Sequence, residues 1–122
     1  MATKLPRALL LAILASTASL PSQVLAHAIV VASSPAPRQT VATSELKLEL
    51  RFNSRVDRSR SPLVLMRPGG AQEPLAIKEG GVGETIETEA KALEKGGHRL
   101  LWQTLSLDGH VTHGEIPFEV DR

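Results

Sequence analysis

Two histidines and one aspartate in this chain have the residue types and the spacing to bind a divalent metal. Asp108 and His110 flank Gly109, whose freedom to adopt a positive φ lets a carboxylate and an imidazole face one point in a tight turn. His27 follows Ala26, where a signal peptidase would cut. Cleavage there frees the α-amine of His27, which can chelate a metal together with ring Nδ1. These residues supply nitrogen and oxygen donors, a set that Cu(II) favours in tetragonal geometry.

The first 26 residues have the three parts of a secretory signal peptide. A basic start is followed by an uncharged apolar run at residues 8–20, and Val24 and Ala26 give the small-residue pattern before the cut. The apolar run is shorter than the roughly 20 residues that span a bilayer. We therefore predict a signal peptide over residues 1–26, one mature domain over residues 27–122, and export to the periplasm.

Composition limits what the mature chain can bind. Removing 26 of the 122 residues leaves 96, the size of one domain. Lys4 and Arg7 go with the leader, so 14 basic residues become 12 against 13 acidic ones, and this balance argues against nucleic acid as a partner. The absence of cysteine excludes thiolate zinc, iron–sulfur and blue-copper sites. Met66 is the only methionine left after processing and is expected in the core, so no soft Cu(I) site of several sulfurs is possible.

The segments that must position the donors have the pattern of strands. Residues 45–52 alternate strictly between apolar and polar, the period of a half-buried strand. Further strands are predicted at residues 63–66, 98–105 and 116–120, and two weaker ones at 29–32 and at 76–77 or 85–88. One helical turn is expected at residues 90–95. Short strands between turn signals predict a small antiparallel sandwich or barrel, with Trp102 in its core.

The remaining polar residues have simpler explanations. His98, inside a predicted strand, is expected to pack or hydrogen-bond in a partly buried position. His113 is three residues after His110, a spacing that would put the two rings on opposite faces of a strand, so it is expected to be solvated or peripheral to the site. Glu115 is expected to be a strand-face charge, although it could orient either histidine. Five arginines, Arg51, Arg55, Arg58, Arg60 and Arg67, are expected to form a solvated edge.

Over its whole mature length the chain resembles the CopC family of periplasmic copper-resistance proteins. The motifs that carry the resemblance are His27-Ala28 after the leader, Ser34-Pro35-Ala36, Leu48-Glu49-Leu50-Arg51-Phe52-Asn53, Gly97 with Trp102, Ser106-x-Asp108-Gly109-His110, and Gly114 with Phe118 and Val120. The resemblance implies an immunoglobulin-like Greek-key β-sandwich. It also implies one Cu(II) per chain, held by the amine and ring of His27, by Asp108 and by His110. A CopD-like inner-membrane copper transporter is the implied partner, and we expect a monomer.

Three classes of function compete at this point. The first, which we predict, is a copper(II)-binding protein for copper resistance and homeostasis that is not an enzyme. The second is a copper redox enzyme, since a chelating N-terminal histidine plus a second histidine also serves copper oxygenases. Three aromatic residues, none of them tyrosine, leave little for a glycan-binding platform. The third is a β-sandwich interaction module that binds no metal and in which Asp-Gly-His is only a hairpin turn.

Overall fold

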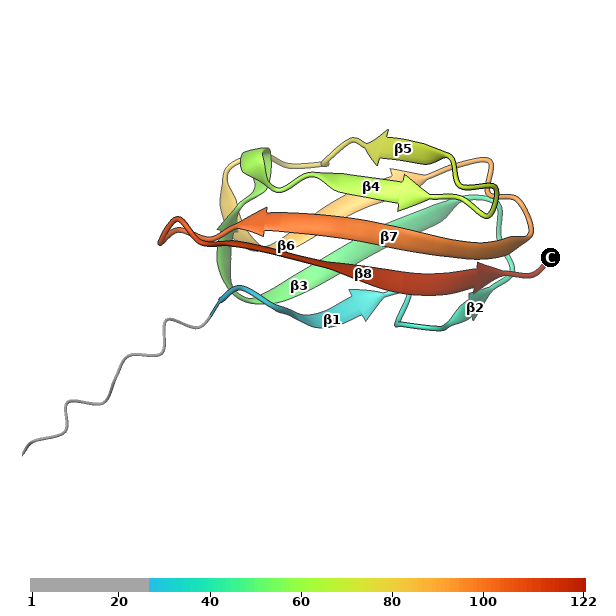
Figure 1. The fold of residues 1–122 in the computed structure, drawn as a ribbon, viewed down its shortest axis with the longest axis horizontal. Coiled ribbons are helices and arrows are strands. Elements are labelled where there is room, and N and C mark those ends of the chain that lie inside the picture. The colour runs from blue at the N-terminus through green and yellow to red at the C-terminus, as the bar shows by residue number, and fades with distance from the viewer. Residues whose placement is uncertain (1–26) are drawn as a thin grey trace, which may run out of the picture.

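The computed structural model describes residues 27–122. In this range, strands with alternating apolar side chains form two β-sheets that face each other (Figure 1). The first sheet contains β1 (Val30–Ser34), β3 (Leu46–Asp57) and β6 (Val82–Ala90), in that order. The second contains β2 (Thr40–Val41), β8 (Val111–Val120), β7 (Gly96–Leu105), β4 (Leu63–Met66) and β5 (Gln72–Leu75), in that order. Neighbouring strands are antiparallel except β2 and β8, which are parallel.

The order of the strands is that of an immunoglobulin-like sandwich. The chain leaves the first sheet after β3 to form β4 and β5 in the second, returns for β6, and crosses again for β7 and β8. In such a fold the pair β3 and β6 faces β4, β7 and β8 across one core. The prediction of an all-β immunoglobulin-like sandwich is confirmed. Between β3 and β4 lies a short 3₁₀ helix, η1 (Arg58–Arg60), and no helix within residues 27–122 is long and apolar enough to cross a membrane.

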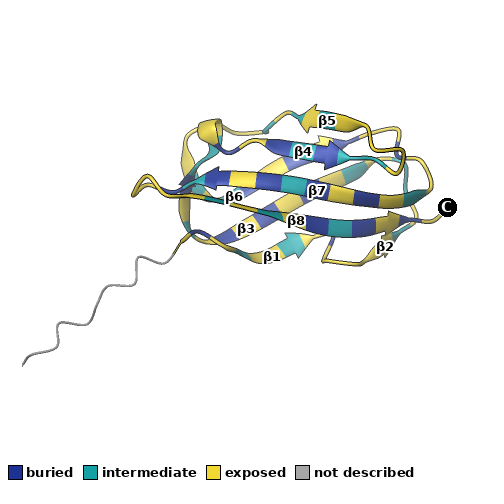
Figure 2. Cartoon of the chain, viewed as in Figure 1, coloured by how far each residue is buried: buried dark blue, intermediate teal, exposed yellow. Residues whose placement is uncertain are grey.

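The core lies between the sheets and is made of the inward-facing residues of five strands (Figure 2). Its fully or nearly fully buried members include Leu48, Leu50 and Phe52 of β3, Leu63 and Leu65 of β4, Ile86 of β6, Leu100 and Trp102 of β7, and Ile116, Phe118 and Val120 of β8. The Trp102 ring meets Phe52 edge-on, with ring centroids 5.5 Å apart. The prediction that Trp102 belongs to the core is confirmed.

The strong strand predictions hold, and the misses have local causes. β2 and β5 were not predicted because β2 has two residues and β5 contains Pro74, which gives it no periodic signal. The prediction of a helical turn at residues 90–95 is wrong. Ala92 has a positive φ of 51°, and Leu93 turns into the core while its N–H donates to the Ser44 carbonyl.

Two surface predictions also need correction. Met66 is only half-buried, because it points to the face of β4 opposite Leu63 and Leu65. Arg58 and Arg67 are not part of a solvated edge, since each side chain is only 17% exposed. Arg67 binds Glu73 at 2.7 Å and Glu94 at 2.6 Å. Arg67 also donates to two backbone carbonyls of the β6–β7 loop. It therefore ties the β4–β5 hairpin to that loop.

Candidate metal centre

The turn between β7 and β8 is tightly hydrogen-bonded and carries two of the three predicted ligands. The N–H of Ser106 donates to the His110 carbonyl at 2.9 Å, and the N–H of Gly109 donates to the Ser106 carbonyl at 3.0 Å. Gly109 has φ +86°, a conformation that a residue with a Cβ adopts only at a cost. The sequence Asp-Gly-His thus forms the turn expected for it, and that turn places Asp108 and His110 together.

Asp108 is held as a carboxylate by three contacts within the turn. The Ser106 hydroxyl donates to Oδ1, and the His110 N–H donates to the same oxygen at 3.1 Å. Oδ2 lies 3.0 Å from Nδ1 of the His110 ring. The hydrogen bond from Ser106, followed by those from His110, holds the pKa of Asp108 well below its usual range. Asp108 is therefore ionised throughout the neutral range.

The third predicted ligand, His27, lies against the same turn. Its ring and that of His110 meet edge-on, with centroids 5.1 Å apart. Next to it, Ala28 is fully buried and fixes the start of the described chain against the core. In Figure 1 the described chain begins at the end of the sandwich where the β7–β8 hairpin turns, and the C-terminus lies at the opposite end.

The nitrogen and oxygen donors of these three residues are of the types that copper(II) accepts. Because a metal–nitrogen bond is about 2 Å long, two imidazoles on one ion have centroids roughly 4–6 Å apart, and the His27 and His110 rings already lie within that range. No three acidic or histidine side chains within residues 27–122 are yet gathered closely enough to form a complete cage. In the uncleaved chain the His27 nitrogen is a peptide amide, so the amine donor exists only after processing.

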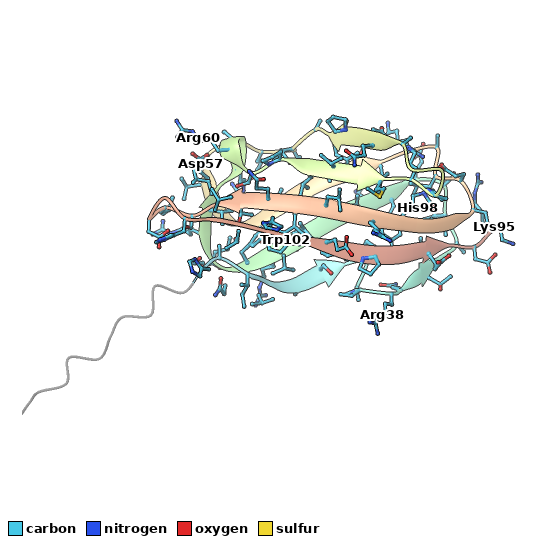
Figure 3. The ribbon with its side chains drawn as sticks, viewed as in Figure 1. Arg38, Asp57, Arg60, Lys95, His98 and Trp102 are labelled. Atoms are coloured by element: carbon cyan, nitrogen blue, oxygen red, sulfur yellow. The ribbon has the colours of Figure 1, made fainter. Side chains whose placement is uncertain are left out.

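The other two histidines occupy β7 and β8. His98 sits near the start of β7, at the opposite end of the strand from the turn (Figure 3), and is fully buried with its ring stacked 5.2 Å from Phe118. It is a packing residue, more deeply buried than predicted. His113 is exposed on β8 opposite Gln103. Glu115 lies 3.7 Å from Arg99 across the strands, as a strand-face charge would.

Sequence reasoning assigned no role to three polar residues that the structure places around the donors. Ser106 binds Asp108, whereas Asn53 and Thr112 bind the backbone of residues 27–29. Ser106 and Asn53 stand in motifs quoted above, but side chains that act through hydrogen bonds to a distant backbone leave no periodic signal in a sequence. Their partners become visible only when the two ends of the mature domain are seen side by side.

The fold and the donors together define a class: a small β-sandwich with a candidate nitrogen–oxygen metal centre at one end. The CopC domain matches residues 30–121, and the chain belongs to this family. Members of the family bind copper in copper resistance, are not enzymes, and are typically periplasmic. Membership therefore excludes the copper redox enzyme and the metal-free interaction module.

Individual relatives agree with the family assignment. CopC from Methylosinus trichosporium OB3b is 26% identical with a TM-score of 0.68, over 78% of this chain and 94% of that one. PcoC, a methionine-rich copper resistance protein from Escherichia coli, is 23% identical with a TM-score of 0.58, over 79% and 100% of the two chains, and supports the fold alone. The copper transport protein CutJ of Bacillus subtilis (strain 168) is 27% identical over 106 residues, 84% of this chain. The chain spans only 20% of CutJ.

Proposed function

We propose that cleavage after Ala26 produces a periplasmic copper(II)-binding protein for copper resistance and homeostasis. It binds one Cu(II) through the amine and ring of His27, the carboxylate of Asp108 and the ring of His110. The predicted signal peptide, residues 1–26, lies outside the described residues, so the proposal takes the cut from the sequence pattern.

One observation carries the proposal: the edge-on contact of the His27 and His110 rings, with Asp108 on the same turn. The two histidines are far apart in the sequence, near the start and near the end of the predicted mature domain. Neither ring belongs to the hydrophobic core. His110 has a side chain that is 45% exposed, which leaves it open to an incoming ion. An aspartate and two imidazoles at an open end of a sandwich form a receptor for a metal.

The chemistry of binding follows from the donors. An α-amine ordinarily has a pKa of about 7.7–8.0 and must lose its proton to bind a metal, whereas Asp108 is already ionised. Copper(II) stands near the top of the divalent affinity order and can compete with that proton. Affinity should therefore rise with pH up to the amine pKa. The carboxylate adds a hard negative donor, which favours the oxidised ion.

We also propose that the protein passes its copper to a CopD-like inner-membrane copper importer. The similarity to CutJ, a copper transport protein about five times the length of the matched region, supports a role beside a transport component. A site at the surface, open at one end of the sandwich, suits an ion that must leave again.

The test uses the processed protein, confirmed by intact mass to begin at His27, in a Cu(II) titration followed by EPR. We expect one equivalent of tightly bound copper with a tetragonal signal that includes nitrogen donors. A variant with one glycine added before His27 should bind far more weakly, because its amine is one residue away from the ring. His110→Asn should also lose affinity, whereas His113→Asn is the matched control and should bind like the parent. Unchanged binding by the glycine-extended protein would overturn the proposed ligand set.

A further inference from the structure

We propose that Asn53 and Thr112 are positioning residues, which hold residues 27–29 between the two sheets and thereby fix the His27 ring opposite His110. The inference rests on the copper(II) function proposed above and extends it to residues that donate nothing to the metal. It starts from how the chain before β1 is held.

Asn53 extends the pairing of β1 with β3 by using its side chain in place of a backbone. The backbone N–H of Asn53 donates to the Ile29 carbonyl at 3.0 Å, and the side-chain Oδ1 of Asn53 accepts the backbone N–H of Ile29 at 2.9 Å. Its Nδ2 donates to the His27 carbonyl at 3.4 Å. The β1–β3 register shifts between Val30 and Ala32, so a regular ladder is already interrupted near this point. A side-chain amide carries one donor and one acceptor group, as a peptide does, and it continues the pairing as far as His27.

Thr112 holds the same segment from the opposite sheet. Its hydroxyl donates to the carbonyl of Ala28 at 2.6 Å. That hydroxyl is also 2.9 Å from the hydroxyl of Thr104, which is fully buried. Because Thr112 has one hydroxyl proton and gives it to Ala28, Thr104 must be the donor to Thr112. The two threonines form a directed chain from the interior of the β7–β8 hairpin to the N-terminal segment.

Together the two tethers fix the backbone around the proposed chelate. Asn53 binds the backbone of His27 and Ile29, and Thr112 binds that of Ala28 between them. Because Thr112 is two positions after His110, its hydrogen bond joins the segment that carries His27 to the segment that carries His110. His27 is exposed to solvent, and its ring contacts the His110 ring edge-on. The backbone that Asn53 and Thr112 hold places His27 beside the β7–β8 turn, within reach of the His110 ring that it contacts. A site ordered before the ion arrives loses less entropy on binding than one that must be assembled.

The experiment compares four variants of the processed protein with the parent. Asn53→Ala removes one tether and Thr112→Val removes the other with little change in shape. Thr112→Ser restores the hydroxyl, and Arg51→Ala changes an exposed residue of β3 as the matched control. Asn53→Ala removes two side-chain hydrogen bonds to residues 27–29 and Thr112→Val removes one. We expect each to weaken Cu(II) binding about five- to tenfold, the order of the net contribution of a neutral hydrogen bond. Thr112→Ser and Arg51→Ala should bind like the parent.

A second measurement uses the metal-free protein and so does not depend on copper. In the parent, NMR should show slow exchange of the Ile29 amide and a nuclear Overhauser contact between the His27 and His110 rings. Asn53→Ala should speed that exchange, and both tether variants should weaken the ring contact. Circular dichroism confirms that each variant is folded, and Asn53, being exposed, tests the inference even where Thr112→Val fails to fold.

The outcomes separate the two proposals. A parent that binds no stoichiometric Cu(II) overturns the proposed function, while the metal-free NMR still decides whether the tethers order His27. A parent that binds, with Asn53→Ala and Thr112→Val of unchanged affinity and unchanged EPR signal, overturns the positioning role and leaves the function standing. Weakening by Thr112→Ser equal to that by Thr112→Val also contradicts it, because the hydroxyl would then not matter.

Discussion

Asp108, a proposed ligand, is held in place by hydrogen bonds from the residues around it. Both of its oxygens already have partners, the hydroxyl of Ser106 and the backbone and ring of His110. These contacts fix the direction of the carboxylate and keep it charged. Oδ2 of Asp108 lies 3.0 Å from Nδ1 of His110, so the carboxylate and the ring face each other across the turn.

The first prediction concerns this carboxylate. Ser106→Ala removes the largest cause of the lowered pKa, so the pKa of Asp108 should rise toward its ordinary value of about 3.9. A lowered pKa contributes stability that is fully present above the unfolded-state pKa and is lost as the pH falls through the folded-state value. Acid should therefore destabilise the parent more steeply than Ser106→Ala. Carbon-13 NMR of the Asp108 carboxyl in metal-free protein measures the shift. Identical titration in both proteins would contradict the assigned role of Ser106.

At the scale of elements, the β7–β8 hairpin carries both the site and part of the core. Trp102 pairs with Gly114 across the two strands, and its ring lies directly over that glycine. The same two strands continue to Thr104 and Thr112, and then to the turn with Asp108 and His110. Packing of Trp102 thus stabilises the part of the β7–β8 hairpin that leads to the turn with the proposed ligands.

The second prediction tests that packing. A Cβ on Gly114 would lie 2.6 Å from Cζ2 of Trp102, so Gly114→Ala must shift the ring from its present position against Phe52. We expect a loss of about 1–3 kcal/mol in the free energy of unfolding, the usual cost of overpacking a core, and a changed tryptophan emission. Gly69→Ala is the control, because its Cβ would meet nothing within 4 Å. Denaturant unfolding measures both, and equal stabilities would show that the ring can move freely.

The third prediction concerns the ties at the other end of the sandwich. Arg67 reaches Glu73, Glu94 and the carbonyls of Lys91 and Ala92, and hydrogen bonds to the two glutamates raise its pKa further. Arg67→Met should lower the free energy of unfolding by about 1–3 kcal/mol, because charged and backbone partners lose their hydrogen bonds together. Arg51→Met, on an exposed face, should change it by less than about 0.5 kcal/mol. Urea unfolding of the metal-free proteins measures both losses, and equal losses for Arg67→Met and Arg51→Met would contradict the role of Arg67. Copper binding by Arg67→Met should be the same as in the parent.

On the scale of the whole molecule, copper bound at the proposed site would join the N-terminal segment to the β7–β8 hairpin and should therefore stabilise the fold. A ligand at 100 times its dissociation constant adds about 2.7 kcal/mol to the free energy of unfolding, provided that the unfolded chain does not bind it. For a domain of this size each kcal/mol is worth about 4–8 °C in Tm.

The fourth prediction follows from this linkage. Adding Cu(II) should raise the Tm of the processed protein by about 10–20 °C at that excess. The glycine-extended protein should gain much less, because its amine cannot close the chelate with the His27 ring. Calorimetry with a chelator as the reverse step measures the shift. An equal gain in both proteins would mean that copper is bound elsewhere.

The sequence by itself determined the class of fold and the identity of the candidate ligands. Strict alternation at residues 45–52 predicts a half-buried strand because side chains of a strand alternate between its faces, and β3 confirms it. The signal-peptide pattern predicts a new N-terminus at His27, and Asp108-Gly109-His110 predicts a turn from chemistry that is local. These features depend on neighbours in the chain, so they are legible without a structure.

Only the tertiary structure decided how distant segments meet. Partners far away in the chain, which no local pattern encodes, made Arg67 a partly buried tie and brought Leu93 into the core. In the same way, Asn53 from one sheet and Thr112 from the other were shown to hold residues 27–29 beside His110. A hydrogen bond depends on distances of a few tenths of an ångström between groups, and those distances are set only when both sheets have packed.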